Sequence, residues 1–113
     1  MKRGTIVLTP FPFTDLSGQK VRPAVVVSRS DRPGNDVLLA FVTTQRSPVP
    51  FPTDLVVEMT HADFAKTGFK ASSVLKLEKL VTIDASIILG ELGELSANLI
   101  QQADEKLRYA LAL

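Results

Sequence analysis

The sequence contains no cysteine and only one histidine, His61. Without cysteine the chain can form no disulfide and offers no thiolate to a metal, and nothing points to an oxidising compartment. A single histidine excludes the multi-histidine metal motifs within one chain. It also excludes a mechanism in which two histidines of one chain act as base and acid.

Glycine-rich phosphate-binding motifs are missing as well. Neither G-x-x-x-x-G-K-[ST] nor G-x-G-x-x-G occurs, so these two kinds of nucleotide site are not expected. No G-x-S-x-G is present to join His61 in a hydrolase triad. We therefore expect no cofactor and no metal.

Long apolar runs are also absent. No run approaches the roughly 18 residues that a membrane span needs. The N-terminal stretch MKRGTIVLTPFPF is broken by Pro10 and Pro12 and does not have the apolar centre of a signal peptide. We expect a cytoplasmic protein that does not enter a membrane.

The chain has 113 residues, of which 45% are hydrophobic, so we expect one globular domain spanning residues 1–113. Its net charge of +1 is too small for a general polyanion binder. The charge is unevenly placed, however. Residues 1–56 carry seven Lys and Arg against four Asp and Glu, whereas residues 57–113 carry six against eight. A localised anion site in the first half remains possible.

Apolar and β-branched segments predict strands before a final helix. The expected strands are 5–9, 24–27, 37–44, 55–59 and 72–84. A short helix is expected after Thr60, ending at Gly68, and the long helix at 97–111, with Ser96 as its N-cap. Strands that precede a separate helix favour a mainly β, α+β domain with antiparallel pairing or a small, partly closed barrel.

The junction TDLSGQKVRPAVVVS places Arg22 where a polar loop meets an apolar strand. Arg22 is either a loop-end cation that pairs with Asp15 or a carbonyl, or a planar fork aimed at a phosphate. Thr43 and Thr44 could add hydroxyls, or could simply reflect the β-propensity of threonine at a strand end. Lys76 and Glu78 lie two residues apart on one strand, where they share either a functional or a solvated face.

Three segments together resemble the MazF/PemK-like toxins of bacterial type II toxin–antitoxin systems. They are RGTIVLTPFPFTDLSGQKVRPAVVVS at 3–28, LLAFVTTQ at 38–45 and SVLKLEKLVTID at 73–84, and a loosely matching C-terminal helix follows them. The resemblance implies an SH3-like, partly closed antiparallel barrel with a long C-terminal helix, working as a homodimer. It also implies a metal-independent endoribonuclease that cuts single-stranded RNA at short motifs and is bound by an antitoxin protein with an acidic tail.

Carried over by position, the resemblance assigns catalysis to Arg22, Thr43 and Glu78. It assigns RNA contacts to six further residues, Asp15, Ser17, Gln19, Lys20, Thr44 and Lys76. Because arginine scarcely deprotonates in proteins, Glu78 is the candidate general base if it faces the site, and Asp15 is the second candidate. Phe11 and Phe51, each flanked by prolines, are the aromatic residues expected to be exposed for base stacking.

The sequence departs from the family pattern at several positions. Thr5 follows the first glycine where many members have aspartate, the loop before Arg22 is short, and Lys76 stands where arginine is common. Two alternative functions remain. One is a toxin of the CcdB type, which shares the fold but inhibits DNA gyrase without cutting RNA. The other is a catalytically weak module that binds RNA or antitoxin.

Overall fold

The computed structural model describes residues 1–11 and 20–113, with only the backbone of Phe11. The elements in chain order are β1 (Thr5–Phe11), β2 (Lys20–Val26), β3 (Asp36–Thr43), β4 (Asp54–Val57), α1 (Phe64–Thr67), β5 (Ser73–Asp84), the 3-10 turn η1 (Ala85–Ile87), β6 (Gly90–Glu94) and α2 (Ala97–Leu111). The strands form one sheet in the order β4-β5-β3-β2-β1-β6, and every neighbouring pair is antiparallel.

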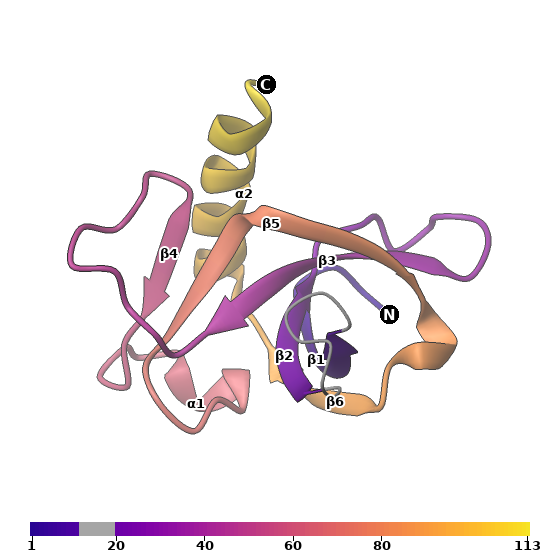
Figure 1. The fold of residues 1–113 in the computed structure, drawn as a ribbon, viewed down its shortest axis with the longest axis horizontal. Coiled ribbons are helices and arrows are strands. Elements are labelled where there is room, and N and C mark those ends of the chain that lie inside the picture. Colours follow the sequence, from indigo (N-terminus) through magenta and orange to yellow (C-terminus); the bar gives the residue numbers. More distant parts are fainter. Residues whose placement is uncertain (12–19) are drawn as a thin grey trace.

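The sheet curls without closing. Figure 1 shows the long strand β5 bending over β3, so that the sheet wraps part of the way around its own interior. The edge strands β4 and β6 stand at opposite ends of the strand order and do not pair with each other. This geometry confirms the expected mainly β, partly closed antiparallel barrel with a C-terminal helix.

Helix α2 has the bounds that its sequence pattern predicts. The Ser96 hydroxyl accepts a hydrogen bond from the Leu99 amide at 3.3 Å and so caps the first turn. Leu99, Ala103 and Leu107 form its buried face, which packs against β5 and β4. Figure 1 shows α2 standing alongside these two strands, with the C-terminus at its free end.

Both faces of the central strands are buried, because apolar residues alternate into two clusters. The cluster on the α2 side includes Ile6, Val25, Ala40, Val42, Leu75 and Leu77. The cluster on the other face consists of Val7, Ala24, Val26 and Leu39, with partly buried side chains such as Phe41, Val81 and Ile83 packed against it. The curl of the sheet thus encloses the second cluster, while the helix covers the first.

A bulge interrupts the pairing of β5 with β3. Phe41 lies opposite Lys76, but the preceding residue, Ala40, lies opposite Leu80. Four steps along β5 therefore correspond to one step along β3. As a consequence, Leu77 and Leu80 both pack with the α2-side cluster although they are three residues apart. The simple alternation of a strand fails across this bulge.

Two local expectations are wrong. The short helix begins at Phe64 rather than after Thr60, because residues 58–64 form turns through the bonds His61 N to Glu58 O and Phe64 N to His61 O. Strand β1 also continues through Pro10 to Phe11. Pairing with β6 ends at Leu8, so the missing N–H of Pro10 removes no bond to that strand.

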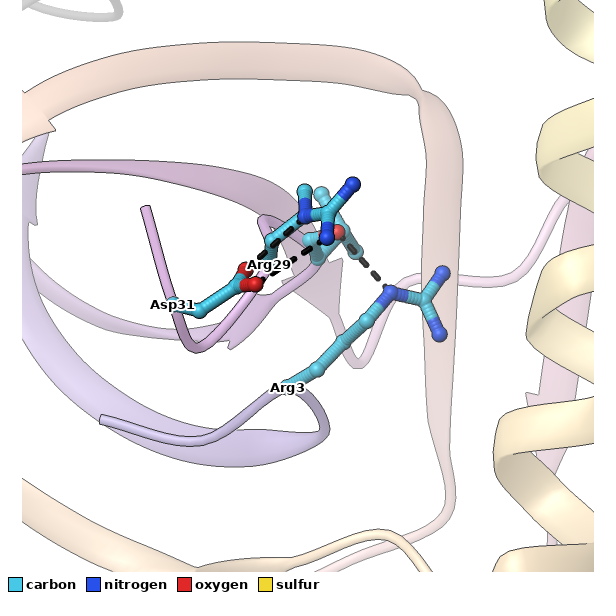
Figure 2. Close-up of polar contacts among 4 residues, drawn as sticks. Arg3, Arg29 and Asp31 are labelled. Carbon is cyan, nitrogen blue, oxygen red and sulfur yellow. Dashed lines mark hydrogen bonds and ion pairs between the residues drawn. The ribbon is translucent and has the colours of Figure 1, made fainter. Parts of the chain in front are cut away.

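The β2–β3 hairpin carries an ion pair at the end of the sheet where β3 begins. Figure 2 shows the Arg29 guanidinium donating two hydrogen bonds, of 2.8 and 3.0 Å, to the Asp31 carboxylate, which lowers the pKa of Asp31. In the same view Arg3 Nε donates to a backbone carbonyl, that of Val27, at 3.0 Å. The Arg3 guanidinium also pairs with Asp104 of α2. These basic residues stabilise local structure.

No helix in the described part of the chain is long and apolar enough to cross a membrane.

Candidate functional site

A basic cleft of about 420 Å³ lies at the end of β3. Its lining consists of Arg22, Phe41, Val42, Thr43, Gln45, Arg46, Ser47, Lys76 and Lys79. Four of these described residues are cationic and none is acidic. In a chain whose net charge is +1, this is a concentrated positive site.

The register of the sheet places the cleft on the face away from α2. Ala24 of β2 lies opposite Phe41 of β3, Phe41 lies opposite Lys76 of β5, and Lys76 lies opposite Asp54 of β4. Directly opposed residues project from the same face of a sheet. Because Ala24 and Phe41 pack in the cluster opposite α2, this row of side chains belongs to that face.

Arg22 and Thr43 lie two residues beyond this row on the neighbouring strands β2 and β3. The antiparallel register, continued two residues beyond the pair Ala24 and Phe41, sets Arg22 opposite Thr43. Arg22 is half-buried and forms no ion pair with any described residue, so its planar fork is available to an anion.

The Thr43 hydroxyl already has one fixed contact. Its oxygen accepts a hydrogen bond from the Gln45 amide at 3.1 Å. That bond orients the oxygen and leaves its hydrogen to donate to a ligand. Arg22 and Thr43 can therefore both donate hydrogen bonds to the oxygens of one phosphate group.

Lys76 is held at the floor of the cleft. Its Nζ lies 2.8 Å from Oδ1 of Asp54 and 5.1 Å from the centroid of the Phe51 ring. The Lys76 side chain is 14% exposed and the Asp54 side chain only 2%. Phe51 itself is exposed, as expected from its proline-flanked position. The ammonium is thus fixed between a buried carboxylate and an aromatic face.

Arg46 and Lys79 complete the positive lining. Arg46 Nη1 pairs with Glu58 Oε1 at 2.7 Å, and both side chains are about half exposed, so this pair is weak and easily exchanged for a phosphate. Lys79 forms no ion pair with a described residue. Among the residues described, no group of three or more His, Cys, Asp or Glu side chains could hold a metal ion.

Comparison with known proteins places the chain in a family. A model of the PemK-like, MazF-like toxins of type II toxin–antitoxin systems matches residues 2–111. The chain belongs to this toxin family. Endoribonuclease EndoA of Bacillus subtilis (strain 168) is 28% identical to this toxin, in an alignment that covers all of the chain and 96% of EndoA.

Solved structures of similar proteins share the fold. An endoribonuclease in complex with its cognate antitoxin, from a mycobacterial species, aligns with a TM-score of 0.78 and 21% identity, covering 100% of this toxin and 96% of that chain. The MazE–MazF structure (Form-III) from Deinococcus radiodurans aligns with a TM-score of 0.75 and 21% identity, covering 100% and 97%. At this identity, the likeness bears on the fold.

The structure brings three of the predicted site residues of the toxin together in the cleft: Arg22, Thr43 and Lys76. It does not bring Glu78, Thr44 or Lys20 there, since all three are exposed and none lines the cleft. The predicted contacts Asp15, Ser17 and Gln19 lie outside the described residues, as does the side chain of Phe11.

The bulge in β5 accounts for the position of Glu78 outside the cleft lining. Spacing two residues from Lys76 predicts a shared face, but the alternation shifts within residues 77–79, and Lys79 lines the cleft instead. Sequence reasoning missed Lys79 and Asp54. An aspartate directly before the apolar run LVV was the available signal for Asp54, because a carboxylate at the start of a buried strand needs a cation near it.

Proposed function

We propose that this toxin is an endoribonuclease that cleaves single-stranded RNA at short motifs without a metal. The observation that carries the proposal is the cleft, where Arg22 and Thr43 share a lining with four cations, Arg22 among them, and no carboxylate of the described residues. The relation to an endoribonuclease of Bacillus subtilis supports the same activity. Because cellular RNA is its target, we propose that the toxin acts in the cytoplasm.

The reaction asks little chemistry of the protein, because RNA brings its own nucleophile. The 2′-oxygen attacks the adjacent phosphorus and loses its proton, while the bond from phosphorus to the 5′-oxygen breaks and that oxygen gains a proton. The products are a 2′,3′-cyclic phosphate and a 5′-hydroxyl. Nucleophile and phosphorus are already neighbours, so alignment and charge stabilisation supply the acceleration.

Arg22 and Thr43 have complementary roles in this proposal. The Arg22 fork donates to two oxygens of the phosphorane as negative charge develops on them. The Thr43 hydroxyl, held by the Gln45 amide, donates to a non-bridging oxygen. The described lining of the cleft contains no carboxylate or imidazole, so we assign these residues to charge stabilisation and not to proton transfer.

Bases of single-stranded RNA would be recognised beside the cleft. The exposed ring of Phe51, next to Lys76, offers a surface on which a splayed base can stack. Lys79 and Arg46 would contact flanking phosphates. This arrangement suits a single strand, whose bases are free to turn toward the protein, better than a duplex.

The test is a cleavage assay on a defined single-stranded RNA in EDTA. Cleavage that survives chelation, yields cyclic phosphate ends and falls by at least a hundredfold in Arg22→Ala supports the proposal. Arg32→Ala, which removes an exposed cation from the β2–β3 hairpin, serves as the control and should cleave normally. Intact RNA together with inhibited gyrase supercoiling would instead favour a CcdB-like toxin.

We also propose that an antitoxin protein with an acidic segment occupies the cleft and that the toxin is a homodimer. The four cations of the cleft complement such a segment, and a related mycobacterial endoribonuclease was solved with its cognate antitoxin. Crosslinks from the antitoxin to Lys76 and Lys79 would support this. Crosslinks confined to α2 would contradict the occupied cleft, and sedimentation as a monomer would contradict the dimer.

A further inference from the structure

Asp54 is the most deeply buried carboxylate among the described residues that contact the cleft lining. Its side chain is 2% exposed, and it begins strand β4 directly opposite Lys76. Oδ2 accepts a hydrogen bond from the Phe51 amide at 3.1 Å. Oδ1 accepts no other hydrogen bond from the described residues, so the Lys76 ammonium at 2.8 Å is its only compensation.

The turn that Asp54 closes does not by itself require a charge. The Asp54 amide donates to the Phe51 carbonyl at 2.9 Å. The side-chain oxygen of a neutral asparagine could accept the hydrogen bond from the Phe51 amide as well as a carboxylate can. A buried negative charge is costly unless it is paired. The charge on Asp54 is therefore explained by Lys76 and not by the turn.

Lys76 is restrained on two sides by one short segment. Asp54 holds its Nζ from β4, and Phe51, three residues earlier, places its ring 5.1 Å from the same nitrogen. A lysine chain without such contacts samples many rotamers. Here the ammonium is held at the floor of the cleft that Arg22 and Thr43 also line.

We propose that Asp54 is a positioning residue for RNA cleavage, which acts by holding the Lys76 ammonium where negative charge develops on the phosphate. This rests on the proposed endoribonuclease function. A cation fixed in advance stabilises the transition state more than a mobile one, because no reorganisation is needed during the reaction. Asp54 also neutralises Lys76 in the resting cleft and so weakens ground-state attraction for RNA.

These two effects have opposite signs, which makes the proposal testable. In Asp54→Asn the side-chain oxygen that accepts the hydrogen bond from the Phe51 amide is retained, but the carboxylate charge is lost. RNA binding should tighten about fivefold at roughly 0.1 M salt, as expected for one more uncompensated cation on a single strand. Single-turnover cleavage should nevertheless slow by about ten- to a hundredfold, since the ammonium is no longer held in place.

A matched set of variants separates positioning from folding. Asp31→Asn breaks an exposed ion pair on the β2–β3 hairpin with the same change of charge, and it should alter neither binding nor cleavage. Lys76→Met should slow cleavage to a similar extent. The double variant Asp54→Asn/Lys76→Met should cleave no more slowly than Lys76→Met alone, because Asp54 acts through Lys76.

A measurement without RNA keeps the proposal open to refutation if Asp54→Asn does not fold. A restrained ammonium exchanges slowly with water, so the wild-type protein should show a lysine ¹H–¹⁵N ammonium signal at neutral pH that disappears in Lys76→Met. The assignment of Asp54 as a positioning residue would be overturned by any of three results. These are the absence of this signal, losses of cleavage rate that add in the double variant, and a joint decline of RNA binding and cleavage in folded Asp54→Asn. A wild-type protein that leaves RNA intact but shows the signal would overturn only the proposed function.

Discussion

Replacing Lys79 tests whether this cation of the cleft contacts RNA. Replacing it with glutamine removes one of the four cations of the lining and retains a polar side chain of similar length. Lys79 forms no ion pair with a described residue, so its loss leaves no carboxylate unpaired there. The effect should therefore be confined to the attraction between the cleft and the phosphates.

The expected magnitude follows from the number of cations in the cleft. Each phosphate contact on a single strand contributes about 0.7 to the slope of log affinity against log salt. Asp54 neutralises Lys76, so three cations of the lining remain to contact phosphates, and raising the salt from about 50 to 200 mM should weaken wild-type binding about 18-fold. In Lys79→Gln the same change of salt should weaken binding only about 7-fold.

Fluorescence anisotropy over a salt series can measure this slope. The ligand should be an RNA with 2′-deoxy substitutions, because it lacks the hydroxyl that we propose as nucleophile and stays intact during the titration. The measured quantity is the difference in slope between wild-type and variant, which is about 0.7 whether or not every other cation is engaged.

Arg32→Gln is the matched control for this experiment. Arg32 is exposed on the hairpin that precedes Asp36, and Thr43 lies seven steps along β3 from Asp36, or ~23 Å. This exceeds the Debye length of about 10 Å at 0.1 M salt, so the slope should be unchanged. Equal slopes for wild-type and Lys79→Gln, or equal reductions in both variants, would refute the placement of RNA in the cleft.

Two further predictions concern the framework of the site. An added Cβ in Gly93→Ala would collide with the backbone of Lys66 and Thr67 in α1, whereas in Gly90→Ala it would meet nothing within 4 Å. We expect Gly93→Ala alone to lower the free energy of unfolding, by about 1–3 kcal/mol, in denaturant titrations at equal protein concentrations. Equal stabilities of the two variants would contradict the close approach. The hydrogen bond from the Ser86 amide is the main reason that the pKa of Asp84 lies below its ordinary 3.8. Ionised Asp84 therefore stabilises the folded protein above pH 3.8, and this contribution is lost as the pH falls through the lower, folded-state pKa. The destabilisation caused by Asp84→Ala should therefore shrink between pH 7 and 2.5 in unfolding titrations, and a constant difference would exclude this linkage.

The elements that depend on nearby residues could be predicted from the sequence. The bounds of α2 follow from the Ser96 cap and the apolar spacing of its buried face, both within one helix. The left-handed conformation of Gly68, with φ of 74°, likewise follows from its position after a short helix. The resemblance to the MazF/PemK-like toxins selected Arg22 and Thr43, and both line the cleft.

The parts that the sequence did not reveal depend on contacts between distant strands. The bulge that moves Lys79 into the cleft arises where β5 passes β3, some forty residues earlier in the chain. The partner of Asp54 is 22 residues away, and only the pairing of β4 with β5 brings the two together. The position of Glu78 outside the cleft lining has the same origin, since period-two alternation holds only where the ladder is regular.

The position of Glu78 outside the cleft lining bears on the chemistry that the site can perform. If Glu78 faced the cleft, a carboxylate base would share the rate enhancement with the cations. With Glu78 exposed outside the described lining, Arg22, Thr43 and Lys76 offer only donors and positive charge. Catalysis then depends on how rigidly these donors are held, because fixed charges stabilise a developing anion more than mobile ones. The buried carboxylate beneath Lys76 supplies that rigidity for the one cation whose own side chain is the most flexible of the three.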